Sequence, residues 1–207
     1  MIHSNPRQMA FGAKVAPRKH RKHVWIRLIL AAVLTVGSWQ VGSSVYLLAK
    51  AHLAQYLIAD AWQETLADGQ PHPPWSWADT HPVARLNFPS LAETTYVLEG
   101  ASGRNMAFGP VHSVTSGMPG SPISTVISAH NDSHFSFLGQ LQMGDVIQTE
   151  TLKGAFSYRV SDIRVVDSDK QQISINQHDE LILTTCYPFN ALQTGGNLRF
   201  QVTAQRL

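Results

Sequence analysis

The nine residues Leu181-Ile182-Leu183-Thr184-Thr185-Cys186-Tyr187-Pro188-Phe189 carry both a structural and a chemical signal. A short run of apolar and β-branched residues is typical of a strand, and the proline that follows cannot donate to a sheet ladder. We therefore expect a strand over residues 181–186 that ends at Cys186. A cysteine at a strand end lies at the rim of a sheet, where a substrate can reach it.

Similar short runs, separated by Gly, Pro, Asn and Asp, lie on both sides of this strand. They predict further strands at residues 83–88, 95–99, 111–115, 124–129, 145–151, 155–166 and 198–205, and a short helix or turn at 102–108. In the last strand, apolar residues alternate with polar ones, as in a half-buried strand. Within 155–166 the apolar parity changes near Ser161-Asp162, which indicates a bulge or bend. So many short strands predict an all-β barrel or sandwich over residues 83–207.

The N-terminal part has a different composition. Residues 1–23 are basic, and residues 28–49 form an uncharged, largely apolar run of 22 residues. About 20 apolar residues suffice to span a bilayer, so we expect a single transmembrane helix over 24–49. A basic cluster before the run predicts a cytoplasmic N-terminus and an extracytoplasmic domain. A cleaved signal peptide has a shorter apolar core and a small-residue cleavage site, and a buried soluble helix does not explain 22 uncharged residues.

Residues 50–82 connect this helix to the strands. A helical pattern continues to about residue 67 and predicts an amphipathic stalk, and the prolines of 68–82 predict a linker. Trp75 and Trp77 are unusual in a free linker, so we expect both to pack on the domain.

Composition excludes several classes of protein. Residues 1–50 hold eight of the 16 Lys and Arg and none of the 14 Asp and Glu, so the remainder of the chain is acidic. A nucleic-acid-binding domain would carry its positive charge on the folded part, so nucleic acid is not an expected partner. A single cysteine excludes an internal disulfide framework and a multi-cysteine metal site.

Cys186 is the first candidate for chemistry. A free cysteine is often a small buried hydrophobe, but an idle thiol in an exported domain risks oxidation. A nucleophilic thiol needs a base or a cationic neighbour. His130 is the candidate base, because it directly follows the predicted strand 124–129. His130, Asp132 and His134 also resemble metal ligands, but no second ligand cluster accompanies them. Arg199 is either a solvated charge or a donor to an oxyanion.

These residues resemble the sortases, the membrane-anchored cysteine transpeptidases of bacterial surfaces. The family's cysteine lies in a Thr-Leu-x-Thr-Cys motif, which Leu183-Thr184-Thr185-Cys186 matches except that Ile182 replaces the first Thr. Its histidine commonly follows Ile-x-Gly, and here Ile127-Ser128-Ala129 precedes His130. Arg199 follows the cysteine as the family's arginine does. Further similar segments are Val83-Ala84-Arg85-Leu86, Gly109-Pro110-Val111-His112 and residues 141–147. Residues 132–135 and 137–138 resemble in particular the sortases of Gram-negative bacteria.

The resemblance implies a closed eight-stranded β-barrel and an acyl-transfer reaction. Cys186 would attack the Thr carbonyl of a C-terminal sorting signal on an exported protein, giving a thioester that an amine acceptor then cleaves. His130 would transfer protons and Arg199 would stabilise the oxyanion, and Thr185 and Asp132 would line the substrate site. No metal or other cofactor is implied. The enzyme would reside in the bacterial inner membrane with its catalytic domain in the periplasm.

Two alternatives remain open at the level of sequence. One is another exported Cys/His acyl transferase, such as an L,D-transpeptidase-like enzyme, although that family has a His two residues before its Cys and Thr184 stands there. The other is a non-catalytic anchored β-domain that binds a partner. Both transferase hypotheses require Cys186, His130 and Arg199 to converge, and the binding module does not.

Overall fold

The computed structural model describes residues 19–189 and 196–207, with side chains from Val24 onward. The chain divides into two compact units, Met1–Ala49 and Lys50–Leu207. The elements follow in the order α1 (Lys19–Asp68), β1 (Pro82–Phe88), β2 (Glu93–Glu99), α2 (Gly103–Met106), β3 (Val111–His112), β4 (Thr125–Ser128), η1 (Leu138–Gln140), β5 (Val146–Thr151), β6 (Gly154–Asp167), β7 (Glu180–Cys186) and β8 (Leu198–Arg206).

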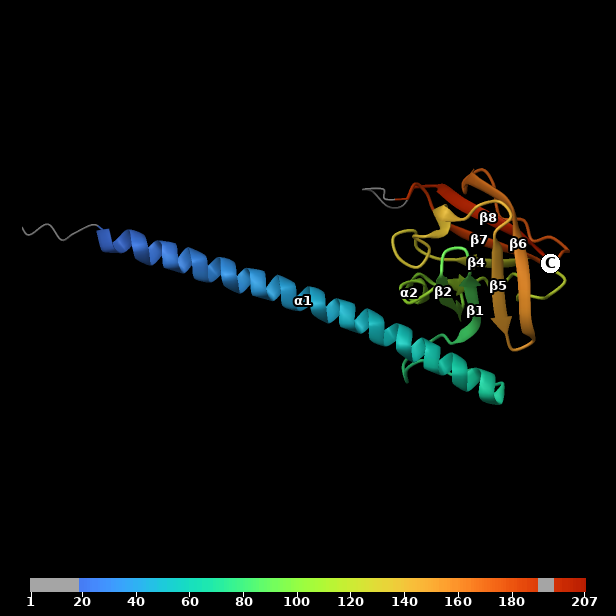
Figure 1. Cartoon of the computed structure of the whole chain (residues 1–207), viewed down its shortest axis with the longest axis horizontal. Coiled ribbons are helices and arrows are strands. Elements are labelled where there is room, and N and C mark those ends of the chain that lie inside the picture. Colours follow the sequence, from blue (N-terminus) through green and yellow to red (C-terminus); the bar gives the residue numbers. More distant parts are fainter. Residues whose placement is uncertain (1–18, 190–195) are drawn as a thin grey trace, which may run out of the picture. The chain divides into compact units, whose positions relative to one another are not determined.

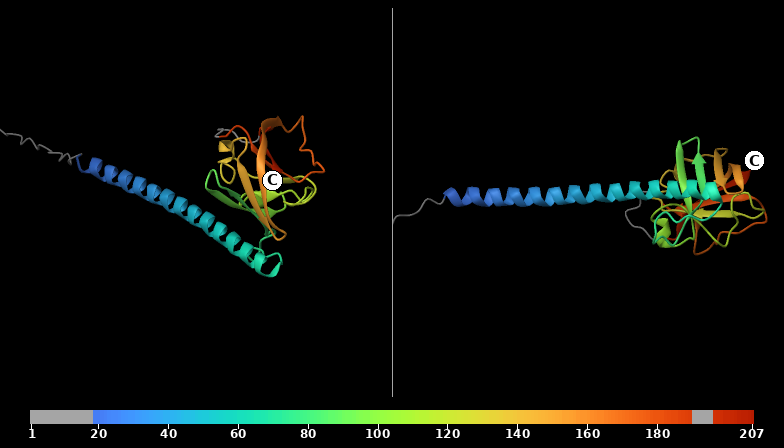
Figure 2. Two further views of the ribbon diagram at one scale, coloured as in Figure 1. Left: turned by 45° about the vertical axis from the view of Figure 1, so that its right-hand side comes forward. Right: turned by 90° about the horizontal axis from the view of Figure 1, so that it is seen from below.

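The eight strands form a closed barrel in the order β1-β2-β3-β4-β7-β8-β6-β5. Figures 1 and 2 show the barrel from three directions. The pairs β2–β3 and β4–β7 are parallel and the others are antiparallel. Closure removes every exposed sheet edge. The prediction of an all-β barrel with eight strands is thereby confirmed.

The strand positions follow the predicted runs closely, with two informative details. The register between β6 and β8 shifts between Val160 and Asp162, so the predicted bulge is confirmed. The strand predicted at 111–115 ends already at His112, because the chain turns there: Ser116 N donates to the carbonyl of Ser113. The predicted short helix is α2, and its first turn is capped by Ser102, whose hydroxyl accepts from Asn105 N.

The barrel interior is filled by alternate residues of the strands and by aromatic side chains from the segment after β4. Phe135 is fully buried, and Phe137 contacts Phe88 with ring centroids 4.9 Å apart. The segment that follows β4 is therefore anchored in the core rather than left as a free loop. This anchoring matters for the site, because the segment begins at His130.

Helix α1 contains a candidate membrane span. Within the described residues, one helix is long and apolar enough to cross a bilayer, over the 45 residues Val24–Asp68. Its most apolar 18-residue window has a mean hydropathy of 1.6, and none of that window is buried. Length and composition are the properties that a membrane anchor requires.

Residues 50–68 of α1 belong to the same compact unit as the barrel and pack against it. The Trp62 side chain is fully buried, and its indole Nε1 donates to Glu150 Oε2 of β5 at 3.1 Å. Ile58 is buried with Leu98 and Val111. Burying an indole contributes roughly 4 kcal/mol by apolar area alone, so this part of the helix is an integral layer of the domain.

The linker tryptophans behave differently from each other. Trp75 packs on Phe108 with ring centroids 4.9 Å apart, as predicted. Trp77 is 81% exposed, so the prediction that it packs on the domain is wrong. The turn at residues 74–77 directs one indole toward the domain and leaves the other in solvent.

Candidate active site

His130 and Cys186 are brought together by two neighbouring parallel strands. The register of β4 and β7 pairs Ser128 with Thr184. The ladder continues one residue further, because Ala129 N donates to the Thr184 carbonyl at 3.2 Å. The Thr185 hydroxyl donates to the Ala129 carbonyl at 2.7 Å. The next residue of each strand is His130 in one case and Cys186 in the other, so the two lie at the same level of the barrel wall.

Arg199 joins them from the other side of β7. Strands β7 and β8 are antiparallel, and Cys186 is the register partner of Arg199. Directly paired residues of neighbouring strands place their side chains on the same face of a sheet. We call the set His130, Cys186 and Arg199 the catalytic row, after the role that the sequence predicts for them.

The catalytic row lies on the outer face of the barrel. Leu183 of β7 and Val202 of β8 belong to the interior core, and side chains of a strand alternate between faces. Cys186 and Arg199 have the opposite parity and therefore point outward. Cys186 and Arg199 are half-buried and His130 is exposed, so a macromolecular substrate can reach all three.

No hydrogen bond or ion pair joins the three side chains to one another in the part of the chain that the structure describes. The Arg199 guanidinium instead donates to the carbonyls of Gly196 at 2.6 Å and Leu198 at 2.9 Å. It is thus held beside its own strand, with donors left over for a substrate, because an arginine side chain carries five N–H groups.

The segments after His130 and after Cys186 are tied together by Asn131. Its side-chain amide donates to the Pro188 carbonyl at 3.0 Å, and Tyr187 N donates to the Leu198 carbonyl at 3.0 Å. The peptide bond between Tyr187 and Pro188 is cis. Asn131 therefore links the two segments that carry His130 and Cys186. This contact could not be found from the sequence, because an asparagine after a strand indicates only a turn.

Aromatic rings cover the end of β7 next to the cysteine. Tyr187 stacks on Phe200 with ring centroids 6.3 Å apart, and Phe189 contacts Phe200 edge-on at 5.2 Å. Phe189 also packs closely on Gly139, where an added Cβ would approach the ring to 2.9 Å. The loop after Cys186 is therefore fixed at its start by packing.

The other predicted site residues are placed as follows. Thr185 is buried and its hydroxyl is used by Ala129, so its observed role is to hold β4 and β7 together. Asp132 is exposed on the turn after His130.

His134 is partly buried, and this burial lowers the pKa of its imidazole. A hydrogen bond to Ala107 opposes the shift, and the nearby His130 adds to it. Among residues 19–189 and 196–207, no three His, Cys, Asp or Glu side chains gather as a metal site would require.

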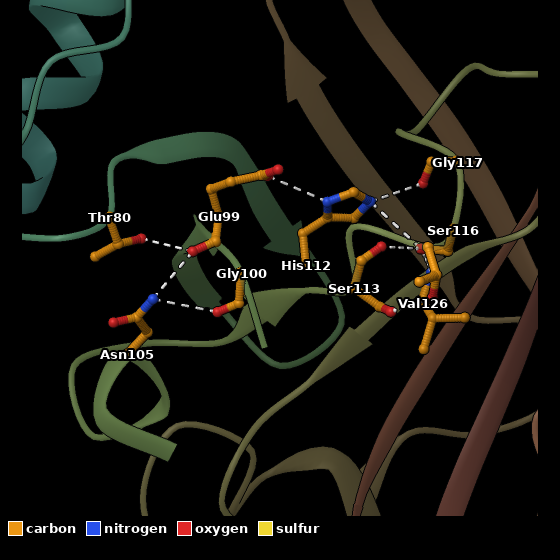
Figure 3. A network of polar contacts seen from close by, with 10 residues as sticks. Thr80, Glu99, Gly100, Asn105, His112, Ser113, Ser116, Gly117 and Val126 are labelled. Carbon is orange, nitrogen blue, oxygen red and sulfur yellow. Dashed lines mark hydrogen bonds and ion pairs between the residues drawn. The ribbon is translucent and has the colours of Figure 1, made fainter. Parts of the chain in front are cut away.

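His112, also available as a base on sequence grounds, lies in a separate network. Figure 3 shows its ring between Glu99 on one side and Gly117 and Ser116 on the other. The distances are 3.2 Å from Nδ1 to Glu99 Oε2 and 3.0 Å from Nε2 to the Gly117 carbonyl. Buried His112 thus ties β2 to the loop before β4 and does not face Cys186.

A second end of the barrel carries a cavity of about 320 Å³ between α1 and the strands, lined by residues that include Trp62, His81, Glu99 and Lys153. No member of the catalytic row lines it. The cavity and the row are therefore separate features of the domain.

Comparisons with known proteins bear on the family and the fold of the chain. A family model described as a sortase domain matches residues 86–207. The chain is 34% identical over 107 residues to sortase D of Bacillus subtilis (strain 168), a match that covers 51% of this chain and 54% of that protein. The chain thus spans about half the length of the curated relative that it matches.

Solved structures show the same fold at low sequence identity. Sortase A from Corynebacterium diphtheriae is 22% identical with a TM-score of 0.56, and the match covers 63% of each chain. A Clostridium perfringens sortase D5 transpeptidase is 19% identical with a TM-score of 0.60, and the match covers 75% of this chain and 99% of that one.

Proposed function

Because the chain belongs to the sortase family, we propose that it is a cysteine transpeptidase that cleaves a C-terminal sorting signal of exported proteins and joins the product to an amine. The observation that carries this proposal is the catalytic row: Cys186 of β7, Arg199 of β8 and His130, two residues after the end of β4, lie at one level of the outer barrel wall. A binding module has no need of such convergence. The L,D-transpeptidase-like alternative is disfavoured by the match of the family model.

The proposed reaction exchanges one amide for another. In the reactive form the thiol proton has moved to His130, and the Cys186 sulfur attacks the carbonyl carbon of the scissile threonine. The C–N bond breaks as His130 gives its proton to the leaving nitrogen, which leaves a thioester on Cys186. An incoming amine attacks this thioester and gives its proton to His130, and the C–S bond breaks to restore the thiolate.

The proposal is tested with the full-length chain in detergent. The probe is a peptide library with one fixed threonine flanked by randomised positions, and the readout is the intact mass of the protein. Hydroxylamine, a small amine that cleaves thioesters, then releases the acyl group as a hydroxamate. An adduct that hydroxylamine does not remove would contradict a thioester mechanism.

Arg199 is proposed to donate to the oxyanion that forms when the thiol adds to the carbonyl. Arg199→Ala is expected to slow single-turnover acylation about 10²–10³-fold, the effect of losing one oxyanion donor. Arg199→Lys is expected to restore little of this rate, because an ammonium lacks the planar fork of donors. Arg159→Ala, on the exposed face of β6, is the matched control and should leave the rate unchanged. An unchanged rate in Arg199→Ala would exclude this role.

We further propose that residues 24–49 anchor the chain in the inner membrane of a Gram-negative cell, with the catalytic domain in the periplasm. The apolar span and the preceding basic residues support the anchor and its orientation, and residues 132–135 and 137–138 support the type of cell. Cys186 is the sole thiol, so a membrane-impermeant maleimide should label the full chain in intact spheroplasts. Labelling only after lysis would reverse the orientation.

A further inference from the structure

Chain connectivity keeps one face of the folded domain close to the proposed membrane span. Lys50, the first residue of the second compact unit, is bonded directly to Ala49, the last residue of that span. Wherever the span points, Lys50 therefore lies at the bilayer surface. Gln55 follows five residues later, about 7.5 Å along α1, and its side-chain amide donates to the Phe108 carbonyl at 2.7 Å. The part of the domain around Phe108 is thus held near the bilayer.

The linker returns to this part of the domain and is fixed there at two points. Trp75 packs on Phe108 with ring centroids 4.9 Å apart. Asp79 accepts a hydrogen bond from Arg104 of α2 at 3.3 Å. Trp77 lies between these two linker residues in the chain, so it belongs to the same surface. We call this surface the anchor face and define it by four residues, Trp75, Trp77, Arg104 and Phe108.

Trp77 is the unusual residue of the anchor face. At 81% it has the largest exposed fraction among the large apolar side chains that the structure describes, above the 76% of Trp39 within the proposed span. Tryptophan is highly buried on average in folded proteins. Its indole joins an apolar body to one N–H donor, and it is enriched where a membrane meets water. Leu53 and Tyr56 of the adjoining helix are exposed as well.

The charges of this region suit a layer of phosphate headgroups. Residues 1–59 contain no Asp or Glu, and the first acidic residue is Asp60. Asp60 lies about 15 Å beyond Lys50 along α1. The headgroup layer on each side of the hydrocarbon core is about 5–8 Å thick, so the acidic side chains of the helix begin beyond it. Asp79, beside the anchor face, is paired with Arg104, whose side chain is mostly exposed.

We propose that the Trp77 indole enters the headgroup layer of the membrane that holds α1, so that the anchor face rests on the bilayer. This inference rests on the proposed membrane anchor and adds a second contact between the chain and lipid. The turn that begins at His130 touches the same part of the domain, because His134 Nε2 lies 3.5 Å from the Ala107 carbonyl. The catalytic row is thereby held near the lipid surface.

The test uses the full-length chain in vesicles of phosphatidylethanolamine and phosphatidylglycerol, with a fraction of lipid that carries a nitroxide on its headgroup. Cys186→Ala removes the sole thiol, so a single new cysteine can carry a fluorophore that the nitroxide quenches at short range. Ser76→Cys places the fluorophore on an exposed residue beside Trp77 and leaves the indole intact. We expect the nitroxide to quench this label.

Two further labels calibrate the measurement. Leu47→Cys lies near the end of the proposed span and should be quenched if the chain is anchored. Leu152→Cys, on the exposed turn between β5 and β6, should stay unquenched. Leu152 lines a cavity with Trp62 and Thr65, which are roughly 18–23 Å beyond Lys50 along α1.

Substitutions of Trp77 separate insertion of the indole from mere proximity of the linker to lipid. Trp77→Ala should abolish most of the quenching of the Ser76→Cys label. Trp77→Tyr should retain it, because tyrosine is also enriched at membrane interfaces. Trp77 is almost fully exposed, so both variants should melt at the temperature of the parent chain in circular dichroism.

The outcomes distinguish this inference from the anchor on which it rests. If Leu47→Cys is quenched and Ser76→Cys is not, as expected if a second copy or the substrate covers Trp77, the inference is overturned and the anchor stands. Unchanged quenching in Trp77→Ala, or equal quenching of Leu152→Cys, would also overturn it. An unquenched Leu47→Cys label would refute the anchor itself, and the inference with it.

Discussion

Replacing Cys186 by alanine is expected to abolish thioester formation completely. The chain contains one cysteine, so no second thiol can substitute for it. A serine at the same position is expected to remain inactive as well, because an unactivated hydroxyl is a far weaker nucleophile than a thiolate. The measurement is the mass of the full-length protein after incubation with the peptide library, before hydroxylamine is added.

The controls for this experiment follow from the position of Cys186. The residue is half-buried at the end of β7, and its outward side chain is not part of the interior core, so Cys186→Ala should melt close to the parent temperature. An acyl adduct on folded Cys186→Ala protein would refute the nucleophile assignment. It would also revive the view of the chain as an anchored binding module.

Replacing His130 by alanine is expected to lower turnover by about 10²–10⁴-fold, the usual contribution of general acid–base catalysis. The His130 side chain is exposed, and the backbone N–H and carbonyl of Ala129 hold the end of this segment against β7. Removing the imidazole should therefore leave Cys186 in place. The loss should appear in both half-reactions, because the same imidazole protonates the leaving nitrogen and deprotonates the incoming amine. Single-turnover acylation and hydroxylamine cleavage measure the two steps separately.

Two other histidines serve as comparisons for His130→Ala. His134 lies on the same turn, and partial burial lowers the pKa of its imidazole. His178 is exposed in the segment before β7. His134→Ala and His178→Ala should each cost far less than His130→Ala. Full turnover in His130→Ala, or an equal loss in His134→Ala, would reassign the base.

The strands could be predicted from the sequence because alternation and turn residues are local signals. The bulge at Ser161-Asp162 can be predicted for the same reason, because the change in parity of the apolar positions is visible in the local sequence. The place of His130 after a strand makes it a candidate base for Cys186, but the pairing of the two strands is not visible in the sequence. Its physical cause is the parallel pairing of β4 with β7, which joins segments more than 50 residues apart.

Other features could not be predicted because they depend on distant partners. The helical pattern of residues 50–67 defines an apolar side but not the surface that covers it, so the burial of Trp62 on Glu150 was not foreseen. Gln201 reads as an outward residue of a half-buried strand, and it does point outward. Its burial arises because residues such as Ser174 of the segment between β6 and β7 line a cavity together with it.

The hydrogen-bonded register that sets the catalytic row also determines how proteins with this barrel can diverge. His130, Cys186 and Arg199 are fixed by the ladders of β4, β7 and β8, whereas the connection from Ser168 to Asp179 lies outside those ladders. Insertions between Gln171 and Asn176, ahead of the bonds that Asn176 makes with Ser124 and Glu180, would leave this register in place. Related barrels can thus differ in the length of this surface segment while the positions of His130, Cys186 and Arg199 stay the same.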